Sequence, residues 1–225
     1  MAENDKLSGN ALSACDAVGR DNGLWDDNFW NQRYATGDYV YGTAPNAFLV
    51  SQAHRFRPGM RVLAVADGEG RNGVWLAEQG LDVVSVDVSP VGQQKAKALA
   101  AARSVNLITV CADLGEWDWR NARFDAVVGI FIQFAGPALR RKIFSGMCAA
   151  LNPGGLVILH GYREEQLGYA TGGPSAIEHL YSESLLQNAF GELDILHLRS
   201  YDAVLDEGQR HCGPSALIDL VARKR

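Results

Sequence analysis

The sequence has no apolar run that approaches the roughly 20 residues of a membrane-spanning helix. Its opening residues, MAENDKLSGN, also lack the apolar stretch of a secretory signal peptide. Basic residues are in the minority, with 21 Lys and Arg against 26 Asp and Glu, and the net charge of −5 argues against a nucleic-acid surface. These absences predict a soluble, cytoplasmic protein with neither a membrane nor a nucleic-acid partner.

Cysteine is also sparse, and its four positions are Cys15, Cys111, Cys148 and Cys212. They are widely scattered, and no cluster of His, Cys, Asp and Glu in the sequence has the spacing of a metal site. We therefore expect free thiols, as in a reducing cytosol, and no bound metal. The chain of 225 residues, with 47% hydrophobic and 21% charged residues, is long enough for a sizeable α/β core.

Large apolar residues are scarce at the start of the chain, which predicts a mobile tail over residues 1–24 with one short helix around residues 12–18. Aromatic residues then crowd into residues 25–58, which we interpret as an N-terminal aromatic cover segment with a helix over residues 46–53. Its aromatic members are Trp25, Phe29, Trp30, Tyr34, Tyr39, Tyr41 and Phe48. Residues 59–225 have the pattern of a single α/β domain.

Strand-like and helix-like runs alternate through that domain. The strands are expected at 61–66, 82–87, 106–111, 124–131 and 156–162, and the helices at 72–80, 89–102, 137–151 and 182–190. This alternation predicts βαβ units and a doubly wound, mostly parallel sheet. The last two apolar runs, at 193–205 and 215–223, leave no room for a helix between them, so we expect a C-terminal antiparallel hairpin.

The first predicted strand leads into a glycine-rich loop. Residues 68–73, GEGRNG, match the G-x-G-x-x-G pattern, in which glycines such as Gly68 and Gly70 let the backbone approach a nucleotide. Asp87 follows Gly68 by 19 positions at the end of the second strand, where an acid can hold a ribose diol. In its strand–turn–helix context the pattern predicts a cofactor site.

The charge of this loop favours one cofactor over another. Asp67 and Glu69 would repel the diphosphate of NAD, whereas the sulfonium and ammonium groups of S-adenosylmethionine would be attracted to them. Asp113 follows the third strand, where its carboxylate can accept from an adenine amino group; a helix cap or a solvated loop residue is the alternative. We therefore predict S-adenosylmethionine as the cofactor and keep a nicotinamide-dependent oxidoreductase as an alternative.

The run VLAVADGEGRNGVWLAEQGLDVVSVDVSPVGQQKAKALA, followed by CADL and LNPGGLVIL, resembles the class I S-adenosylmethionine-dependent methyltransferases. Within them, WNQRYATGDYVYGTAPNAFL is similar to the bacterial tellurite-resistance and thiopurine methyltransferase-like group. The resemblance implies a Rossmann-like sheet of seven strands, with the last strand antiparallel beside the fifth. One departure is that Ala64 and Ala66 stand where that class has an acid and a glycine, so we expect Asp67 to take over part of the acid's task.

Residues of the loop, the strand ends and the aromatic segment make up the predicted cofactor site. They are Trp30, Arg33, Ala66, Asp67, Gly68, Gly70, Arg71, Asn72, Asp87, Val88, Ser89, Ala112, Asp113, Leu114 and Ile130. Arg33 is hard to explain as a core residue, so a carboxylate partner is expected, while Arg71 is open between that role and the surface. Trp30, Arg33 and Tyr34 form either a lid that closes over the cofactor or a fixed hydrophobic cover.

Methyl transfer can be accelerated largely by positioning, so the sequence need not contain a catalytic residue. Candidates are His160 and Tyr162 at the end of the fifth strand and His211 before the last one. We predict a methyltransferase acting on a small-molecule acceptor such as a thiol, a metalloid or another soft nucleophile, as a monomer or homodimer. A non-enzymatic S-adenosylmethionine-binding module is a further alternative.

Overall fold

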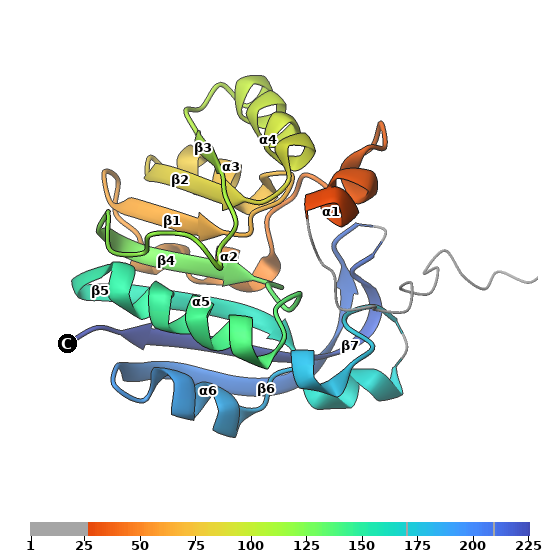
Figure 1. Ribbon diagram of the computed structural model, residues 1–225, viewed down its shortest axis with the longest axis vertical. Helices are drawn as coiled ribbons and strands as arrows, with labels where there is room; N and C mark the ends of the chain where they lie inside the picture. The colour runs from red at the N-terminus through yellow and green to blue at the C-terminus, as the bar shows by residue number, and fades with distance from the viewer. Residues whose placement is uncertain (1–26, 170, 209) are drawn as a thin grey trace, which may run out of the picture.

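A seven-stranded sheet forms the centre of the structure, a computed structural model that describes residues 27–169, 171–208 and 210–225 (Figure 1). Its strands lie in the order β3-β2-β1-β4-β5-β7-β6. Their bounds are Arg61–Val65 (β1), Asp82–Asp87 (β2), Ile108–Cys111 (β3), Phe124–Ile130 (β4), Leu151–Tyr162 (β5), Asp194–Asp206 (β6) and Cys212–Arg223 (β7). The predicted tail over residues 1–24, with its short helix, lies outside the described residues.

The five strands β1 to β5 run parallel to one another, and β7 lies antiparallel between β5 and β6. This arrangement confirms the predicted doubly wound, Rossmann-like sheet with a C-terminal antiparallel hairpin. The physical reason is the length of the connections, because a parallel crossover needs about a dozen residues and the turn between β6 and β7 is much shorter. The carboxyl ends of β1 to β5 therefore meet at one edge of the sheet.

Helices cover both faces of the sheet. Their bounds are Asp27–Tyr34 (α1), Ala47–Ser51 (α2), Arg71–Glu78 (α3), Pro90–Ala102 (α4), Pro137–Ala150 (α5) and Glu183–Phe190 (α6), with short 3-10 turns at Ala53–Arg55, Glu164–Gly168 and Ile177–His179. Phe144 of α5 and Phe190 of α6 pack into the apolar cluster on one face, and Leu49 of α2 and Leu76 of α3 into the cluster on the other. No helix within the described part of the chain is long and apolar enough to cross a membrane.

Local signals set the helix starts. Ser89 caps α4 by accepting from the backbone N–H of Gly92, with Pro90 in the first turn, as expected, and Asn46 caps α2 by accepting from Leu49. Most boundaries differ from the expectation by one or two residues, and β7 begins at Cys212 rather than at 215. Helix α1 was not predicted, and β5 begins at Leu151 rather than at 156, because Leu151 pairs with Phe124 before a register irregularity.

Candidate functional site

A cleft of about 930 Å³ opens at the carboxyl ends of the parallel strands. Ala66 after β1, Asp87 at the end of β2, Cys111 at the end of β3 and Ile130 at the end of β4 all line it. Most of the predicted cofactor residues also line it, namely Trp30, Ala66, Asp67, Gly68, Arg71, Asn72, Asp87, Val88, Ala112, Asp113, Leu114 and Ile130. Ligands bind in open α/β sheets at this edge, so the cleft is the candidate site.

Asp87 has a carboxylate that backbone hydrogen bonds hold in a fixed orientation at the cleft. Its side chain is buried, Oδ2 accepts from the backbone N–H of Gly68 at 2.8 Å, and Oδ1 accepts from Ser89 at 2.8 Å. Burial raises the pKa of Asp87 to about 6, against the lowering effect of these backbone N–H groups. Because a carboxylate has about four acceptor positions, these bonds leave acceptor capacity on Asp87 for a ligand.

The loop after β1 takes backbone conformations that favour glycine. Gly68 and Gly70 have φ values of 57° and 86°, and Ala66 adopts φ 49° although it carries a side chain. Gly70 does not line the cleft. It faces α4 instead, where a Cβ on it would lie 2.6 Å from the Cβ of Ala96. The structure thus gives Gly70 a packing role between α3 and α4, and Ser89, the cap of α4, likewise stands outside the lining.

Asp67 uses its carboxylate inside the protein. Oδ1 accepts from the backbone N–H of Gly73 at 3.1 Å, and Oδ2 accepts from Ser85 Oγ at 2.9 Å. Burial raises the pKa of Asp67 to about 7, and the neighbouring Asp87 adds to the rise. The carboxylate is thus directed to the start of α3 and to β2, although Asp67 also borders the cleft.

Glu69 does not present the free negative charge to the cofactor that the sequence of the loop predicted. Its side chain is buried, and Oε1 lies 2.7 Å from the ammonium group of Lys95. Oε2 accepts from the backbone N–H of Val40 at 2.8 Å. Because Lys95 compensates the charge of Glu69, Glu69 serves mainly to hold the aromatic segment against the loop, and it adds little negative charge to the cleft.

Arg71 is not a surface residue. Its Nη2 atom lies 2.8 Å from Oε2 of Glu207, at the β6–β7 turn, and both side chains are largely buried. The other terminal nitrogen, Nη1, is buried without a hydrogen-bond partner among the described residues. Since Arg71 lines the cleft, one cationic N–H group there is available to a ligand.

Helix α1 borders the cleft through Trp30, whose ring stacks on Tyr34 with the ring centroids 5.5 Å apart. Arg33 does not line the cleft; its guanidinium lies 4.6 Å from the ring centroid of Phe29 and donates to Tyr41 Oη at 3.4 Å. Asp113, which follows β3, is exposed in the cleft wall, with Oδ1 accepting from the backbone N–H of Gly115. Whether α1 moves as a lid stays a prediction.

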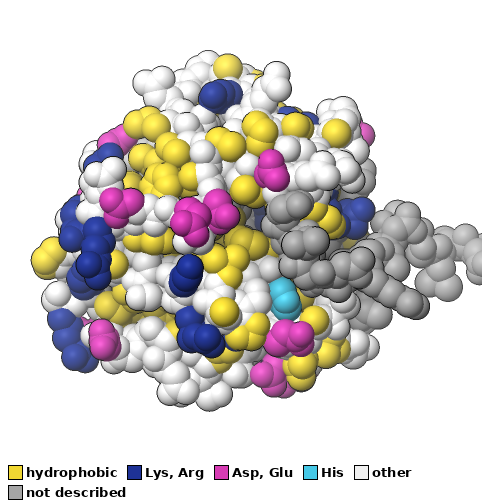
Figure 2. Space-filling view, viewed as in Figure 1, with side chains coloured by type: hydrophobic (Ala, Val, Ile, Leu, Met, Phe, Trp, Pro, Cys, Tyr) yellow, Lys and Arg dark blue, Asp and Glu magenta, His cyan; other side chains and the backbone are white. Residues whose placement is uncertain are grey.

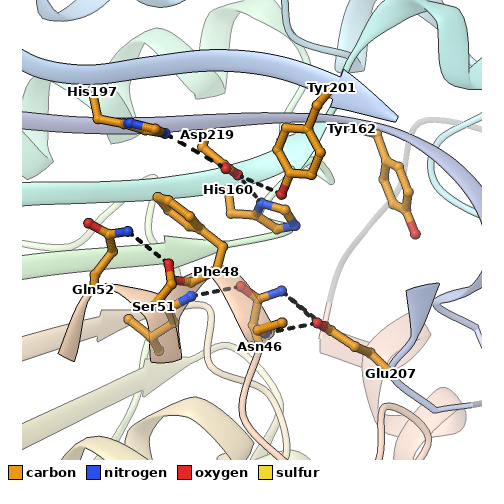
Figure 3. Close-up of polar contacts among 12 residues, drawn as sticks. Asn46, Phe48, Ser51, Gln52, His160, Tyr162, His197, Tyr201, Glu207 and Asp219 are labelled. Carbon is orange, nitrogen blue, oxygen red and sulfur yellow. Dashed lines mark hydrogen bonds and ion pairs between the residues drawn. The ribbon is translucent and has the colours of Figure 1, made fainter. Parts of the chain in front are cut away.

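His160, one of the predicted catalytic candidates, does not line the cleft. Its Nδ1 lies 2.6 Å from Asp219 Oδ1 on β7, and Tyr201 Oη donates to the same oxygen (Figure 3). The ring packs between Phe48 and Phe131, with centroid distances of 5.6 and 4.6 Å. His160 belongs to a buried polar network of β5, β6 and β7, because its side chain leaves the sheet on the face that α2 covers.

Tyr162 and His211 border a smaller cavity of about 60 Å³, which we call the recess. It shares Trp30, Tyr41, Phe131, Phe134 and His211 with the cleft and adds Arg33, Gln133, Tyr162, Gly173, Pro174 and Arg210. Tyr162 Oη and His211 Nδ1 are buried without hydrogen-bond partners among the described residues. Burial and the nearby Arg71 hold the pKa of His211 well below its usual range, so its ring is neutral at pH 7.

Sequence reasoning missed the residues that follow β4. Phe131 takes φ 54° and lines both the cleft and the recess, and Gln133 donates to the carbonyl oxygen of Tyr162 at 2.8 Å. Their position directly after a parallel strand was a usable signal, because ligands of open α/β sheets bind at the carboxyl ends of the strands. Figure 2 shows Lys and Arg side chains gathered at the left, the edge away from the carboxyl ends of these strands. The described residues contain no group of three or more His, Cys, Asp or Glu that could hold a metal ion.

A protein-family model described as a methyltransferase domain matches residues 62–155, from β1 through the start of β5. The chain is 32% identical over 167 residues to a glycine/sarcosine N-methyltransferase of Halorhodospira halochloris, covering 66% of this chain and 58% of that protein. It is 30% identical over 129 residues to a carboxy-S-adenosyl-L-methionine synthase of Geobacter metallireducens, covering 56% and 51%. The chain thus spans little more than half the length of these curated relatives.

Solved structures share the fold at low sequence identity. TehB from Haemophilus influenzae superposes with a TM-score of 0.67 at 19% identity, over 88% of this chain and 67% of that one. The N-methyltransferase NodS from Bradyrhizobium japonicum, solved with S-adenosyl-L-homocysteine, gives 0.68 at 13% identity, over 88% and 97%. At such identities the likeness supports the fold alone, over 88% of this chain, and says nothing of the acceptor.

Proposed function

Because the chain belongs to the class I S-adenosylmethionine-dependent methyltransferases, we propose that it transfers a methyl group to a small-molecule acceptor bound in the cleft. The observation that carries the proposal is Asp87, a buried carboxylate at the carboxyl end of β2 that borders the cleft and is held in place by the backbone N–H groups of Gly68 and Ser89. That arrangement matches two neighbouring hydroxyls of a ribose.

Further residues fit the other parts of the cofactor. Asp113 and Leu114 in the cleft wall would receive the adenine, with the Asp113 carboxylate accepting from its amino group. The unpartnered Nη1 of Arg71 would donate to the carboxylate of the methionine part, whereas Arg33 borders the adjoining recess and not the cleft. Trp30 of α1 would cover the ligand, since aromatic faces attract a sulfonium.

S-adenosylmethionine, when bound, supplies a methyl group on a sulfonium that is already activated for displacement. The residues of the cleft therefore act by orienting the acceptor in line with that group and by excluding water. Phe131, Phe134 and Tyr41 form a largely apolar wall where the acceptor would lie. A proton acceptor is needed only for an acceptor atom that is protonated, and the neutral His211 ring faces this end of the cleft.

Calorimetric titration with S-adenosylhomocysteine and with NAD tests the cofactor assignment. We expect S-adenosylhomocysteine to bind in the micromolar range and NAD not to bind. Transfer of label from methyl-labelled S-adenosylmethionine to a panel of small thiols and amines tests the activity itself. Binding without transfer to any acceptor would favour the non-enzymatic module, and binding of NAD alone would overturn the proposal.

A further inference from the structure

We propose that the recess binds the anionic group of the methyl acceptor, a small oxyanion with a carboxylate as the first choice, and that Arg210 recognises it. This inference rests on the proposed methyltransferase function and names the chemical class of its acceptor. The recess opens from the cleft, with which it shares five residues, among them the rings of Tyr41 and Phe131. A group in the recess would thus belong to a molecule that extends into the cleft.

The charges of the two cavities differ in sign. The cleft is bordered by the carboxylates of Asp27, Asp87 and Asp113 and by one arginine, apart from Asp67 and Glu69, whose carboxylates are engaged inside the protein. The recess is bordered by Arg33 and Arg210 and, among the described residues, by no Asp or Glu. The nearby carboxylate of Glu207 is already engaged by Arg71 and by the side chain of Asn46. A cationic cofactor and an anionic acceptor would each meet the complementary charge.

The two arginines are not equivalent. Arg33 donates to Tyr41 Oη at 3.4 Å and lies against the rings of Phe29 and Trp30, so its guanidinium is partly engaged. Arg210 has neither a carboxylate within ion-pair distance nor an aromatic ring beneath it in the described part of the chain. A guanidinium can bind a carboxylate with two parallel N–H···O bonds, and Arg210 is the one that is free to do so.

Two buried polar atoms add to the need for a polar occupant. Tyr162 Oη and His211 Nδ1 both belong to residues that border the recess, and neither has a partner among the described residues. A buried polar atom without a hydrogen bond is unfavourable, so an occupant that bonds to both atoms removes that penalty. The volume of about 60 Å³ admits a few heavy atoms, on the scale of a carboxylate and its neighbouring carbon.

Matched acceptor pairs test the inference. Mercaptoacetate is compared with 2-mercaptoethanol, and glycine with ethanolamine, because each pair differs in a carboxylate against a hydroxymethyl group. Binding is measured by calorimetry with the enzyme saturated with S-adenosylhomocysteine, and methyl transfer with labelled S-adenosylmethionine. We expect the carboxylate member of at least one pair to be preferred at least tenfold in Kd and in kcat/KM.

The variant Arg210→Met is expected to reduce that preference to within about twofold and to leave the Kd of S-adenosylhomocysteine unchanged. Arg120→Met, in an exposed loop, is the matched control and keeps the preference. Tyr162→Phe, which removes only the buried hydroxyl, is expected to raise the KM of the preferred acceptor several-fold.

Several outcomes would overturn the inference. They are equal behaviour within both pairs, no binding of any of the four compounds, or a preference that survives in Arg210→Met. Weaker S-adenosylhomocysteine binding by Arg210→Met would instead assign the recess to the cofactor and also overturn it. In each of these cases the proposed function stands as long as the wild-type protein binds S-adenosylhomocysteine, so the two failures are distinguishable.

Discussion

Arg71 and Glu207 form a buried ion pair, with Nη2 and Oε2 2.8 Å apart, that joins the start of α3 to the turn between β6 and β7. Oε1 of Glu207 also accepts from the backbone N–H of Ala47 and from Asn46 Nδ2. The pair thus connects the aromatic segment, the cofactor loop and the C-terminal hairpin. Removing one partner of a buried pair leaves the other charge uncompensated, which costs about 3–5 kcal/mol.

The variant Glu207→Gln is therefore expected to lower the free energy of unfolding by several kcal/mol, measured by urea denaturation at pH 7. Burial raises the pKa of Glu207, but Arg71 and the N–H groups of Ala47 and Asn46 outweigh it and lower the pKa overall. This stabilisation is present above the pKa of an unfolded glutamate and is lost as the pH falls through the lower, folded value. Glu116→Gln, at an exposed position, is the control, and an equal effect in both variants would contradict the assignment.

Asp87→Asn is expected to weaken S-adenosylhomocysteine binding at least tenfold, because it removes the charge from two hydrogen bonds to the ribose. Since the pKa of Asp87 is raised to about 6, wild-type affinity is also expected to fall as the pH drops through 6, when the carboxylate takes up a proton. Calorimetry at pH 5.5 and 7.5 measures both effects. Asp82→Asn, at the exposed start of the same strand, is expected to bind normally, and unchanged affinity in Asp87→Asn would refute the role.

Asp67 is expected to make the folded protein less stable as the pH rises. Its pKa is about 7 when folded and close to the ordinary value of 3.8 when unfolded, so the folded state holds the proton more tightly between these values. Stability is thus lost as the pH rises from about 4 to 7. Asp67→Asn keeps the acceptor for Gly73 and is expected to remove this dependence, which has a slope of about 1.4 kcal/mol per pH unit between the two pKa values.

Thermal unfolding of both proteins from pH 5 to 8 provides the measurement, with Asp38→Asn at an exposed position as the control. Parallel pH profiles for wild type and Asp67→Asn would show that Asp67 keeps an ordinary pKa. Asp87 and Arg71 are the charged neighbours that act on Asp67, and neither is altered by this substitution.

The aromatic segment is expected to divide into a fixed and a responsive part. Glu69 accepts from the backbone N–H groups of Val40 and Tyr41, so their amide hydrogens are expected to exchange slowly with or without ligand. Helix α1 borders the cleft and is expected to gain protection when S-adenosylhomocysteine is added. Hydrogen exchange read by mass spectrometry separates the two parts, and equal protection of α1 in both states would identify it as a permanent cover.

Gly70→Ala is expected to cost at least about 1 kcal/mol of stability, because its new Cβ would lie 2.6 Å from that of Ala96 and its φ is 86°. Gly70 does not line the cleft, so the affinity of the folded fraction for S-adenosylhomocysteine is expected to change little. Gly168→Ala, where a Cβ meets nothing within 4 Å, is the control in thermal unfolding. A large loss of affinity with full stability would restore a direct cofactor contact to Gly70.

Much of the fold could be predicted because it depends on local and periodic signals. Alternating runs of apolar residues set the strands, the Ser89–Pro90 pair began α4, and the short connection near Glu207 required an antiparallel hairpin. The loop glycines and Asp87 were found for the same reason, since their spacing follows from a strand, a turn and a helix that are contiguous in the chain. Helix α1 was missed because its eight residues carry mixed, mostly polar side chains with little apolar periodicity.

The order of residues along the chain is therefore enough to predict the class of sheet and the edge at which its ligand binds. How the charges pair follows instead from the three-dimensional packing, because Glu69 meets Lys95 and Arg71 meets Glu207 through contacts between distant segments. The same packing turns His160 away from the cleft toward Asp219, and it brings Arg33, Tyr162 and Arg210 together around the recess. Such pairings depend on which faces of separate elements meet, and the local spacing of residues along the chain does not predict them.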